Sequence, residues 1–470
     1  MTQRHRLDQR SGFRPLRAGL DRRGFLGLAA AGVSAAALTA CGGGPSTSGG
    51  GSAKKVEQID FSGVKPAKQI TFWTSNPGDS QKITQQIIND FHASQSDIKV
   101  KLVSAGADYE EIAQKFQTAQ TGGNLPDLVV LSDVWWFRYM MNDQIIPVDS
   151  LFDALGFETD DYVDSLLGDY VYNDVHWAVP WARSTPIFYY NKQHFKKAGL
   201  DPAKVTATWE DFADAAAKLK QASGAKYAFQ LPALAGYAGW SFQNNLWGWG
   251  GGWSKKDSFD LLCDSEESVA ALQFLKDAVY KDKWAGVASV NATQDLAAGV
   301  ASATVGSTGD LISTLTAAKF DVGVGILPGG PKVPTPSADT SVCPTGGSGV
   351  GIPKGIDKAN QLAAGTFIKF LTSPENTVKF AQATGYMPIR KSADTSSLLK
   401  KVPQAKTAID QLAITRPQDY ARVFLPNGDI EMANHCANIL TQNKDVKSEM
   451  SALRTKLESI YTGQVKPHIS

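Results

Sequence analysis

Short apolar runs alternate with amphipathic stretches from residue 68 onwards. Residues 69–74, 98–103 and 127–131 are short runs rich in apolar side chains, which is typical of strands. Residues 81–92 and 109–120 instead repeat apolar side chains every three or four positions, so each predicts a helix with one buried face. This β-α-β-α-β order predicts a mostly parallel sheet covered by helices, and hence the α/β class.

The same alternation resumes after Val179-Pro180. Residues 186–191 form another apolar run, and Thr208 precedes a periodic stretch that begins at Trp209, where a threonine hydroxyl would cap a helix. Further helices are predicted at 267–280, 308–318, 360–371, 374–383, 402–412 and 446–461, with a strand at 321–327 and a Gly/Pro-rich loop at 328–336. No internal repeat is evident. A chain of this length exceeds one usual hydrophobic core, so we expect two domains.

The first 40 residues have the pattern of an export signal. Residues 1–23 hold seven Arg and no Lys, and residues 24–40 are uncharged and rich in Ala, which is typical of a signal peptide. Arg22-Arg23 is followed by Gly-Phe-Leu, as in twin-arginine signals, although Asp21 stands where Ser or Thr is more usual. Residues 38–41 (LTAC) are similar to a lipobox, so we expect a lipid on Cys41; an incidental Cys is the alternative. Residues 41–67 would be a flexible tether, because they begin with Gly and Ser.

Charge and cysteine content exclude several functional classes. The chain has 47 Lys and Arg against 46 Asp and Glu. Without residues 1–40, which contain seven Arg and two Asp, the formal charge is −4, so nothing indicates nucleic-acid binding. No later segment is long and apolar enough to span a membrane. Cys263, Cys343 and Cys436 are far apart in the sequence, so we expect buried free thiols rather than a metal site, and their pairing stays open.

No motif for catalysis is present. The chain lacks HExxH, GxSxG and the phosphate-binding loop of nucleotide hydrolases. Residues 347–351 read GSGVG but open no evident helix, and the His residues are scattered. A glycosidase-type carboxylate pair is defined only in space, so it stays open. We therefore expect a protein that is not an enzyme and that needs neither a cofactor nor a metal.

Aromatic side chains are concentrated in one segment. Residues 237–253 hold six aromatics among seventeen residues, beside Gly, Asn and Gln. We expect most of these rings to fill a core. Tyr237 and Trp240 are three positions apart, so they can share one helical face. Two ring faces with few charges nearby would suit a sugar ring or a quaternary ammonium group.

Several blocks resemble the solute-binding components of bacterial ABC importers of the maltose-binding type (extracellular solute-binding protein family 1). They are DYEEIAQKF (108–116), PDLVVLSDVWWF (126–137), YVDS (162–165), ARSTP (182–186), WSFQ (240–243), CPTGG (343–347), TGYMP (384–388) and QDYARVFLP (418–426). Within this group the chain is most similar to the actinobacterial, mycobacterial-type lipoproteins that bind glycerol-3-phosphate and glycerophosphocholine. The resemblance extends over nearly all of residues 68–460.

The resemblance implies a two-lobed periplasmic-binding-protein-like fold (type II, maltose-binding-like) with a ligand cleft between the lobes. It places residues 68–182 plus 321–375 in lobe 1 and residues 183–320 plus 376–470 in lobe 2. Tyr109 and Asp133 would hydrogen-bond the hydroxyls of a glycerol group, because a carboxylate accepts hydroxyl protons well. Arg422 would pair with the anionic oxygens, because its guanidinium fork fits a phosphate. The alternatives are a helix cap for Asp133, where enteric relatives carry Glu, and a structural salt bridge for Arg422.

The other implied ligand residues serve the phosphate and the far end of the ligand. The phosphate would accept hydrogen bonds from hydroxyl and backbone N–H groups of Ser184, Ser307 and Gly347. Tyr237, Trp240 and Tyr386 would line the far end, where a choline cation gains about 0.5–2 kcal/mol per ring. Enteric relatives carry Trp at the Tyr237 position and mycobacterial ones carry Leu, so Tyr237 could instead stack on a sugar or hydrogen-bond a hydroxyl.

The function implied by the resemblance is capture of glycerophosphodiesters, such as glycerophosphocholine, or of sn-glycerol-3-phosphate. The expected partners are a pair of ABC permease subunits with a cytoplasmic ATPase. The expected location is the extracytoplasmic face of the cell membrane, with a monomer held by the lipid on Cys41. An oligosaccharide receptor of the same architecture is the first alternative. A cell-wall hydrolase or esterase is the second.

Overall fold

The computed structural model describes residues 58–75, 79–333 and 342–469, and these residues belong to one compact unit. The predicted signal peptide, the lipobox with Cys41 and most of the tether lie outside the described residues. Among the described residues, no helix combines the length and the apolar character needed to cross a membrane.

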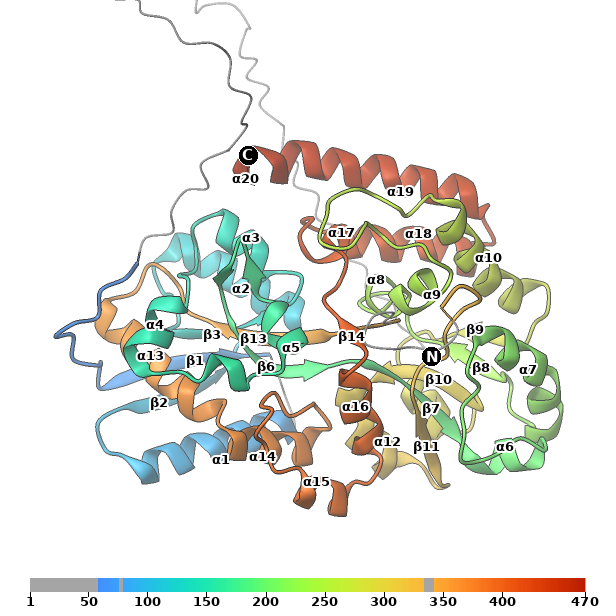
Figure 1. The fold of residues 1–470 in the computed structure, drawn as a ribbon, viewed down its shortest axis with the longest axis horizontal. Coiled ribbons are helices and arrows are strands. Elements are labelled where there is room, and N and C mark those ends of the chain that lie inside the picture. Colours follow the sequence, from blue (N-terminus) through green and yellow to red (C-terminus); the bar gives the residue numbers. More distant parts are fainter. Residues whose placement is uncertain (1–57, 76–78, 334–341, 470) are drawn as a thin grey trace, which may run out of the picture. The chain divides into compact units, whose positions relative to one another are not determined.

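The first sheet has five strands in the order β2-β1-β3-β13-β6 (Figure 1). They are β1 (Gln69–Thr74), β2 (Lys99–Ser104), β3 (Leu128–Ser132), β6 (Val179–Ser184) and β13 (Gly346–Gly351). β1 pairs in parallel with β2 and β3, whereas β13 is antiparallel to β3 and β6. All five residues of β3 are buried, because the strand is central in the sheet. The predicted parallel β-α-β start is confirmed, and two antiparallel strands complete the sheet.

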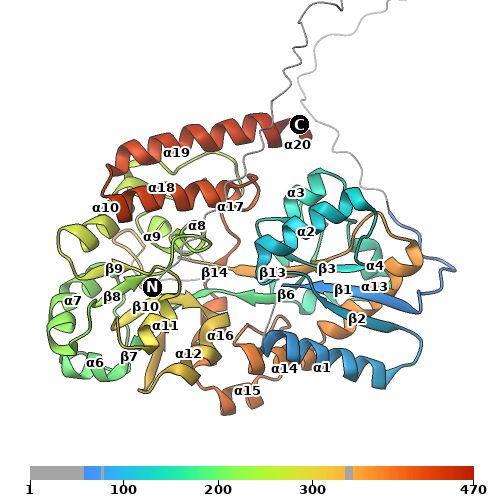
Figure 2. The same cartoon turned by 180° about the vertical axis from the view of Figure 1, so that it is seen from behind.

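Helices cover both faces of the first sheet. Figures 1 and 2 show α2 (Tyr109–Gly122) and α3 (Trp136–Met141) on one side, with α1 (Asp79–Ser94) and α14 (Pro374–Thr384) on the other. α2 begins where the Asp108 carboxylate accepts the N–H of Glu111 at 2.9 Å, and it ends at Gly123 with φ 75°. An acidic N-cap and a left-handed glycine are the usual signals for the two ends of a helix. The cap places Tyr109 in the first turn of α2.

The second sheet has the order β11-β7-β10-β8-β9. Its strands are β7 (Pro186–Asn191), β8 (Phe229–Leu231), β9 (Ala285–Val287), β10 (Ala303–Ser307) and β11 (Val322–Gly325). β7 is antiparallel to β10 and β11, and β8 is parallel to its two neighbours. The predicted cap of α7 (Trp209–Ser223) is confirmed, because the Thr208 hydroxyl accepts the N–H of Asp211.

Two elements, β11 and α14, do not pack with the lobe that was predicted for them. Residues 321–375 were assigned to the first lobe, but β11 pairs with β7 in the second sheet. Residues 376–470 were assigned to the second lobe, but α14 packs against α1, where Lys379 contacts Asp90 at 2.9 Å. Both elements lie next to a crossing between the sheets, where hydrophobic pattern alone does not reveal which sheet a segment joins.

The chain crosses between the sheets through Thr185, which alone separates β6 from β7. Its buried hydroxyl donates to the carbonyl of Pro344 at 2.9 Å and accepts from Gln411 at 3.0 Å. Pro344 belongs to β12 (Cys343–Pro344), which pairs in parallel with β14 (Thr415–Arg416). Three chain segments therefore pack together between the two sheets.

Five more helices agree with the predicted stretches to within a few residues. They are α10 (Glu266–Tyr280), α12 (Leu311–Ala317), α13 (Lys358–Leu371), α16 (Ala405–Leu412) and α19 (Val446–Ile460). Helix α18 (Gly428–Gln442) was not predicted. Cys263, Cys343 and Cys436 are buried free thiols, as expected. Burial raises the pKa of Cys263 to about 12, so this thiol is protonated and unreactive at neutral pH.

Candidate ligand-binding site

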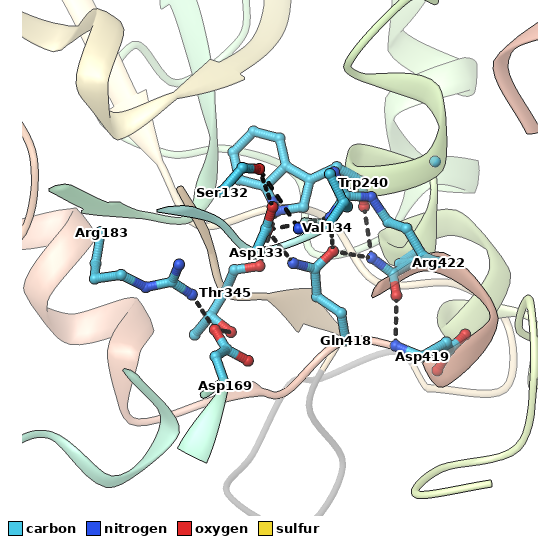
Figure 3. A network of polar contacts seen from close by, with 12 residues as sticks. Ser132, Asp133, Val134, Asp169, Arg183, Trp240, Thr345, Gln418, Asp419 and Arg422 are labelled. Carbon is cyan, nitrogen blue, oxygen red and sulfur yellow. Dashed lines mark hydrogen bonds and ion pairs between the residues drawn. The ribbon is translucent and has the colours of Figure 1, made fainter. Parts of the chain in front are cut away.

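Asp133 follows the last residue of β3 and is the centre of a polar network (Figure 3). Its backbone N–H donates to the carbonyl of Gly347 at 3.1 Å. Its carboxylate accepts from the Gln418 amide, from Arg422 Nη1 at 3.1 Å and from Ser132 Oγ at 3.1 Å, and the residue is only 4% exposed. Helix α3 starts three residues later without a side-chain cap. Asp133 is therefore an ion-paired residue at the end of a central strand and not a helix cap.

Arg422 lies on the short helix α17 (Tyr420–Val423) and is 5% exposed. Its Nη1 donates to Asp133 and to the amide oxygen of Gln418. Its buried Nε has no hydrogen-bond partner among the described residues. A buried guanidinium donor without a partner is uncommon and calls for an explanation. The alternative considered for Arg422, a structural salt bridge, is present, and its Nε remains without a partner among the described residues.

The backbone of β13 approaches β6 closely at Gly347. This residue has φ 101°, and a Cβ at this position would lie 2.2 Å from the carbonyl oxygen of Ala182. The register between the two strands shifts at the same point. Only glycine fits here, because a side chain would clash and the backbone is left-handed. Ser184 ends β6 opposite Gly346, and its hydroxyl has no partner in the part of the chain that the structure describes.

Tyr109 points from the first turn of α2 toward the same strand. Its hydroxyl donates to Ser348 Oγ at 3.3 Å, and the phenol of Tyr386 lies nearby. Burial raises the pKa of Tyr109, so the phenol is neutral and can donate or accept. Tyr109 therefore connects the strand ends around Asp133 with the aromatic side chains of the predicted far end.

The predicted far end contains three aromatic residues. The ring centroids of Tyr237 and Trp240 are 5.8 Å apart, with a 57° angle between the planes. Trp240 Nε1 donates to the carbonyl of Thr345 at 2.9 Å (Figure 3). Tyr386 stacks on Phe380 with centroids 5.7 Å apart. Tyr237 and Tyr386 keep part of their surface exposed, so their rings can contact a ligand.

Ser307 and Asp310 form a capping box at the end of β10. Ser307 Oγ accepts the N–H of Gly309 at 3.0 Å, and Asp310 Oδ2 accepts the N–H of Ser307 at 3.0 Å. The same Oδ2 accepts the Tyr237 hydroxyl at 3.1 Å. Burial raises the pKa of Asp310. Asp310 was not predicted as a site residue, although the Ser-x-x-Asp spacing before an apolar run is a recognisable signal.

A second buried ion pair supports the strands beneath the site. Arg183 on β6 donates to the carboxylate of Asp169 and to the Tyr170 hydroxyl at 2.8 Å, and Thr345 also donates to Asp169 (Figure 3). Burial raises the pKa of Asp169 to about 6, against the opposing effect of Arg183. These residues connect β6 to the start of β13. Like Gln418 and Ser348, they carried no sequence signal for a role at the site.

Comparison with known proteins shows the family of this chain. A family model described as bacterial extracellular solute-binding protein matches residues 86–407. The chain belongs to this family. It is 30% identical over 418 residues to the sn-glycerol-3-phosphate-binding periplasmic protein UgpB of Escherichia coli (strain K12), covering 85% of this chain and 89% of that protein.

Solved structures agree with the family assignment. This solute-binding protein is 38% identical to UgpB of Mycobacterium tuberculosis, whose crystal structure contains glycerophosphocholine, with a TM-score of 0.79 over 85% of this chain and 100% of that one. A maltosyl-maltose-binding protein of Arthrobacter globiformis has the same fold at 20% identity, with a TM-score of 0.71 over 84% of this chain and 99% of that one. The predicted two-lobed, maltose-binding-like fold is confirmed. The protein is a solute receptor, and its family members and relatives are binding proteins and not enzymes.

The charges of the candidate site do not favour an anion alone. Arg422 is already paired with Asp133, and burial raises the pKa of Asp429, which lies partly buried in the first turn of helix α18. Asp310 adds a further carboxylate at the aromatic end. In the part of the chain that the structure describes, no group of three or more His, Cys, Asp or Glu is placed to hold a metal ion. The site therefore combines hydrogen-bond donors near Arg422 with carboxylates on both sides.

Proposed function

We propose that this solute-binding protein captures glycerophosphodiesters, such as glycerophosphocholine, for an ABC importer. The observation that carries the proposal is the buried Arg422 Nε without a protein partner beside Asp133. A phosphodiester oxygen would satisfy this donor in a charge-assisted hydrogen bond. The names of the two UgpB relatives, one a glycerol-3-phosphate receptor and one solved with glycerophosphocholine, support the same ligand class.

In this proposal each predicted residue has a defined role. Asp133 and Tyr109 accept and donate hydrogen bonds to the glycerol hydroxyls. Arg422 binds the phosphate together with donors from Ser184, Ser307 and Gly347. Tyr237, Trp240 and Tyr386 contact the head group. The residues come from both lobes, and closure of the lobes around the crossing segments near Thr185 would bury the ligand.

The charge of the site favours a diester over sn-glycerol-3-phosphate. A phosphate monoester carries up to two negative charges, whereas a diester with a cationic head group has no net charge. One arginine that is already paired with Asp133 compensates a single negative charge at most, and Asp310 and Asp429 would repel a second. We therefore expect the monoester to bind more weakly than the diester.

The proposal extends to the location of the receptor. A lipid on Cys41 and the tether at 41–67 would hold a monomer at the extracytoplasmic face of the membrane. Anchoring raises the effective concentration of the receptor near its permease pair and ATPase. Metabolic labelling with a fatty-acid analogue tests this part: labelling of the full chain and its loss in Cys41→Ala are expected, and labelling of both would contradict it.

Titration calorimetry with glycerophosphocholine, sn-glycerol-3-phosphate and maltotriose tests the ligand class. We expect micromolar or tighter binding of the diester, weaker binding of the monoester and no heat with the sugar. Heat with the sugar alone would instead support the oligosaccharide receptor, the alternative that the Tyr237–Trp240 ring pair favours. Release of choline during incubation would indicate a hydrolase.

A further inference from the structure

Asp310 is a carboxylate without a cationic partner at the aromatic end of the site. Its Oδ2 accepts the Ser307 N–H and the Tyr237 hydroxyl. Its Oδ1 accepts no hydrogen bond from a described residue, and no Lys or Arg among the described residues forms an ion pair with it. The groups that face it are the phenols of Tyr189, Tyr237 and Tyr386.

The capping box does not by itself explain a carboxylate at this position. A cap needs only an acceptor for the Ser307 N–H, and the amide oxygen of Asn would serve as well. Burial disfavours the charged form, which is why the pKa of Asp310 is raised. A carboxylate that is partly buried without a counter-ion is unfavourable for stability unless something else balances its charge.

Tyr237 holds one oxygen of this carboxylate in place. The phenol donates its proton to Oδ2 at 3.1 Å, while its ring lies 5.8 Å from that of Trp240. The hydrogen bond fixes Oδ2 and leaves Oδ1 as an acceptor beside the ring pair. A side chain without a hydroxyl at position 237 cannot make this bond, so the arrangement depends on the residue that this chain carries.

We propose that Asp310, held by Tyr237, binds the cationic nitrogen of the ligand head group and favours a primary ammonium over a quaternary one. This inference rests on the proposed function and names the head group that the site selects. A primary ammonium donates up to three hydrogen bonds, to Oδ1 and to the phenol oxygens. A quaternary ammonium has no N–H, so it gains only charge attraction and contact with the ring faces.

Calorimetric titration of the full chain with glycerophosphoethanolamine, glycerophosphocholine and sn-glycerol-3-phosphate tests the proposal. We expect the ethanolamine diester to bind more tightly than the choline diester. Asp310→Asn keeps an acceptor for the cap and removes the charge. It should weaken binding of the ethanolamine diester roughly 10- to 100-fold, weaken the choline diester less, and leave the monoester unchanged or tighter.

Two further variants separate recognition from structure. Asp282→Asn removes a carboxylate from an exposed position of the same lobe and should change no affinity. Tyr237→Phe keeps the ring but frees the carboxylate, and it should reduce the preference for the ethanolamine diester. Melting temperatures close to that of the unsubstituted protein would show that the variants are folded.

The outcomes separate the role of Asp310 from the proposed receptor function. Equal loss of all three ligands in Asp310→Asn, or an unchanged ratio between the two diesters, would overturn the role of Asp310 while the receptor function stands. Tighter binding of the choline diester by the unsubstituted protein would also overturn it. Absence of binding for all three ligands would overturn the proposed function itself.

Discussion

The two ends of the candidate site differ in how their polar groups are held. At the Asp133 end, the carboxylate is fixed by Arg422, Gln418 and Ser132, and the ion pair is almost fully buried. At the Tyr237 end, Asp310 is held by one phenol and one backbone N–H, without a cation. The first end is a preorganised network, whereas the second is an aromatic wall with an uncompensated charge.

This difference indicates where affinity and where specificity arise. A preorganised pair needs little rearrangement when a ligand arrives, so it can supply affinity for any glycerophosphate. An uncompensated carboxylate instead distinguishes ligands by the charge and the hydrogen-bond donors of their head groups. Substitutions at the Asp133 end should therefore weaken all ligands, and substitutions at the Tyr237 end should change their order.

The largest effect is expected from Arg422→Ala. The change removes the phosphate ligand and leaves Asp133 buried without its ion-pair partner, which is strongly destabilising in itself. Affinity for glycerophosphocholine should fall by about 100-fold or more, and the melting temperature should fall as well. Titration calorimetry and thermal melting measure the two losses. Arg422→Lys keeps the charge without the fork and should retain part of both; an Ala variant with unchanged affinity would favour the neutral sugar as ligand.

Asp133→Asn should have the next largest effect. The amide keeps the shape but replaces charge-assisted hydrogen bonds to the hydroxyls and to Arg422 with weaker neutral ones. We expect about tenfold weaker binding of both the diester and the monoester, by a similar factor, because both carry the glycerol group. A loss confined to one ligand would contradict the assignment of Asp133 to the glycerol end.

The sequence predicted the secondary structure and the positions of the site residues better than it predicted their partners. Periodicity located α2, which has one buried face, and short apolar runs located β1 and β7. It could not place β11 or α14, which depend on which sheet a segment joins after a crossing. Asp133 and Arg422 were found through family resemblance, but their mutual ion pair joins positions 289 residues apart and has no local signal.

The residues that were missed share a physical reason. Their place in the candidate site depends on tertiary contacts, and the local sequences around Gln418 and Ser348 are ordinary. Asp310 alone has a local pattern, its spacing from Ser307, and that pattern indicates only a helix cap. Its contact with Tyr237 arises because α8 (Ala238–Ser241) and β10 meet in the fold. The contact between Asp310 and Tyr237 could therefore not be predicted without the tertiary structure.

Trp240→Phe should have a moderate and selective effect. The substitution keeps an aromatic face but removes the N–H that donates to Thr345 and reduces the ring area. Cation–π attraction is strongest with Trp, so we expect roughly 3- to 10-fold weaker binding of glycerophosphocholine. The monoester lacks a head group, and its affinity should change less than twofold by the same titration. Equal losses would indicate that Trp240 serves only to support β13.

The smallest effect concerns stability without ligand. Burial raises the pKa of Asp310 in the folded state above its ordinary value of 3.8. The unfolded chain therefore releases this proton first as the pH rises, and the contribution of Asp310 to folding becomes less favourable through that window. Asp310→Asn removes this contribution, so its melting temperature should match that of the unsubstituted protein near pH 3.5 and exceed it by on the order of 1–3 °C near pH 7.5. Differential scanning calorimetry of both proteins across this range measures the difference. A variant that is less stable at every pH would mean that Asp310 is a structural cap. The expected gain in melting temperature near pH 7.5 would instead mean that the protein keeps a destabilising carboxylate at the head-group end. Specificity for a cation requires such a carboxylate.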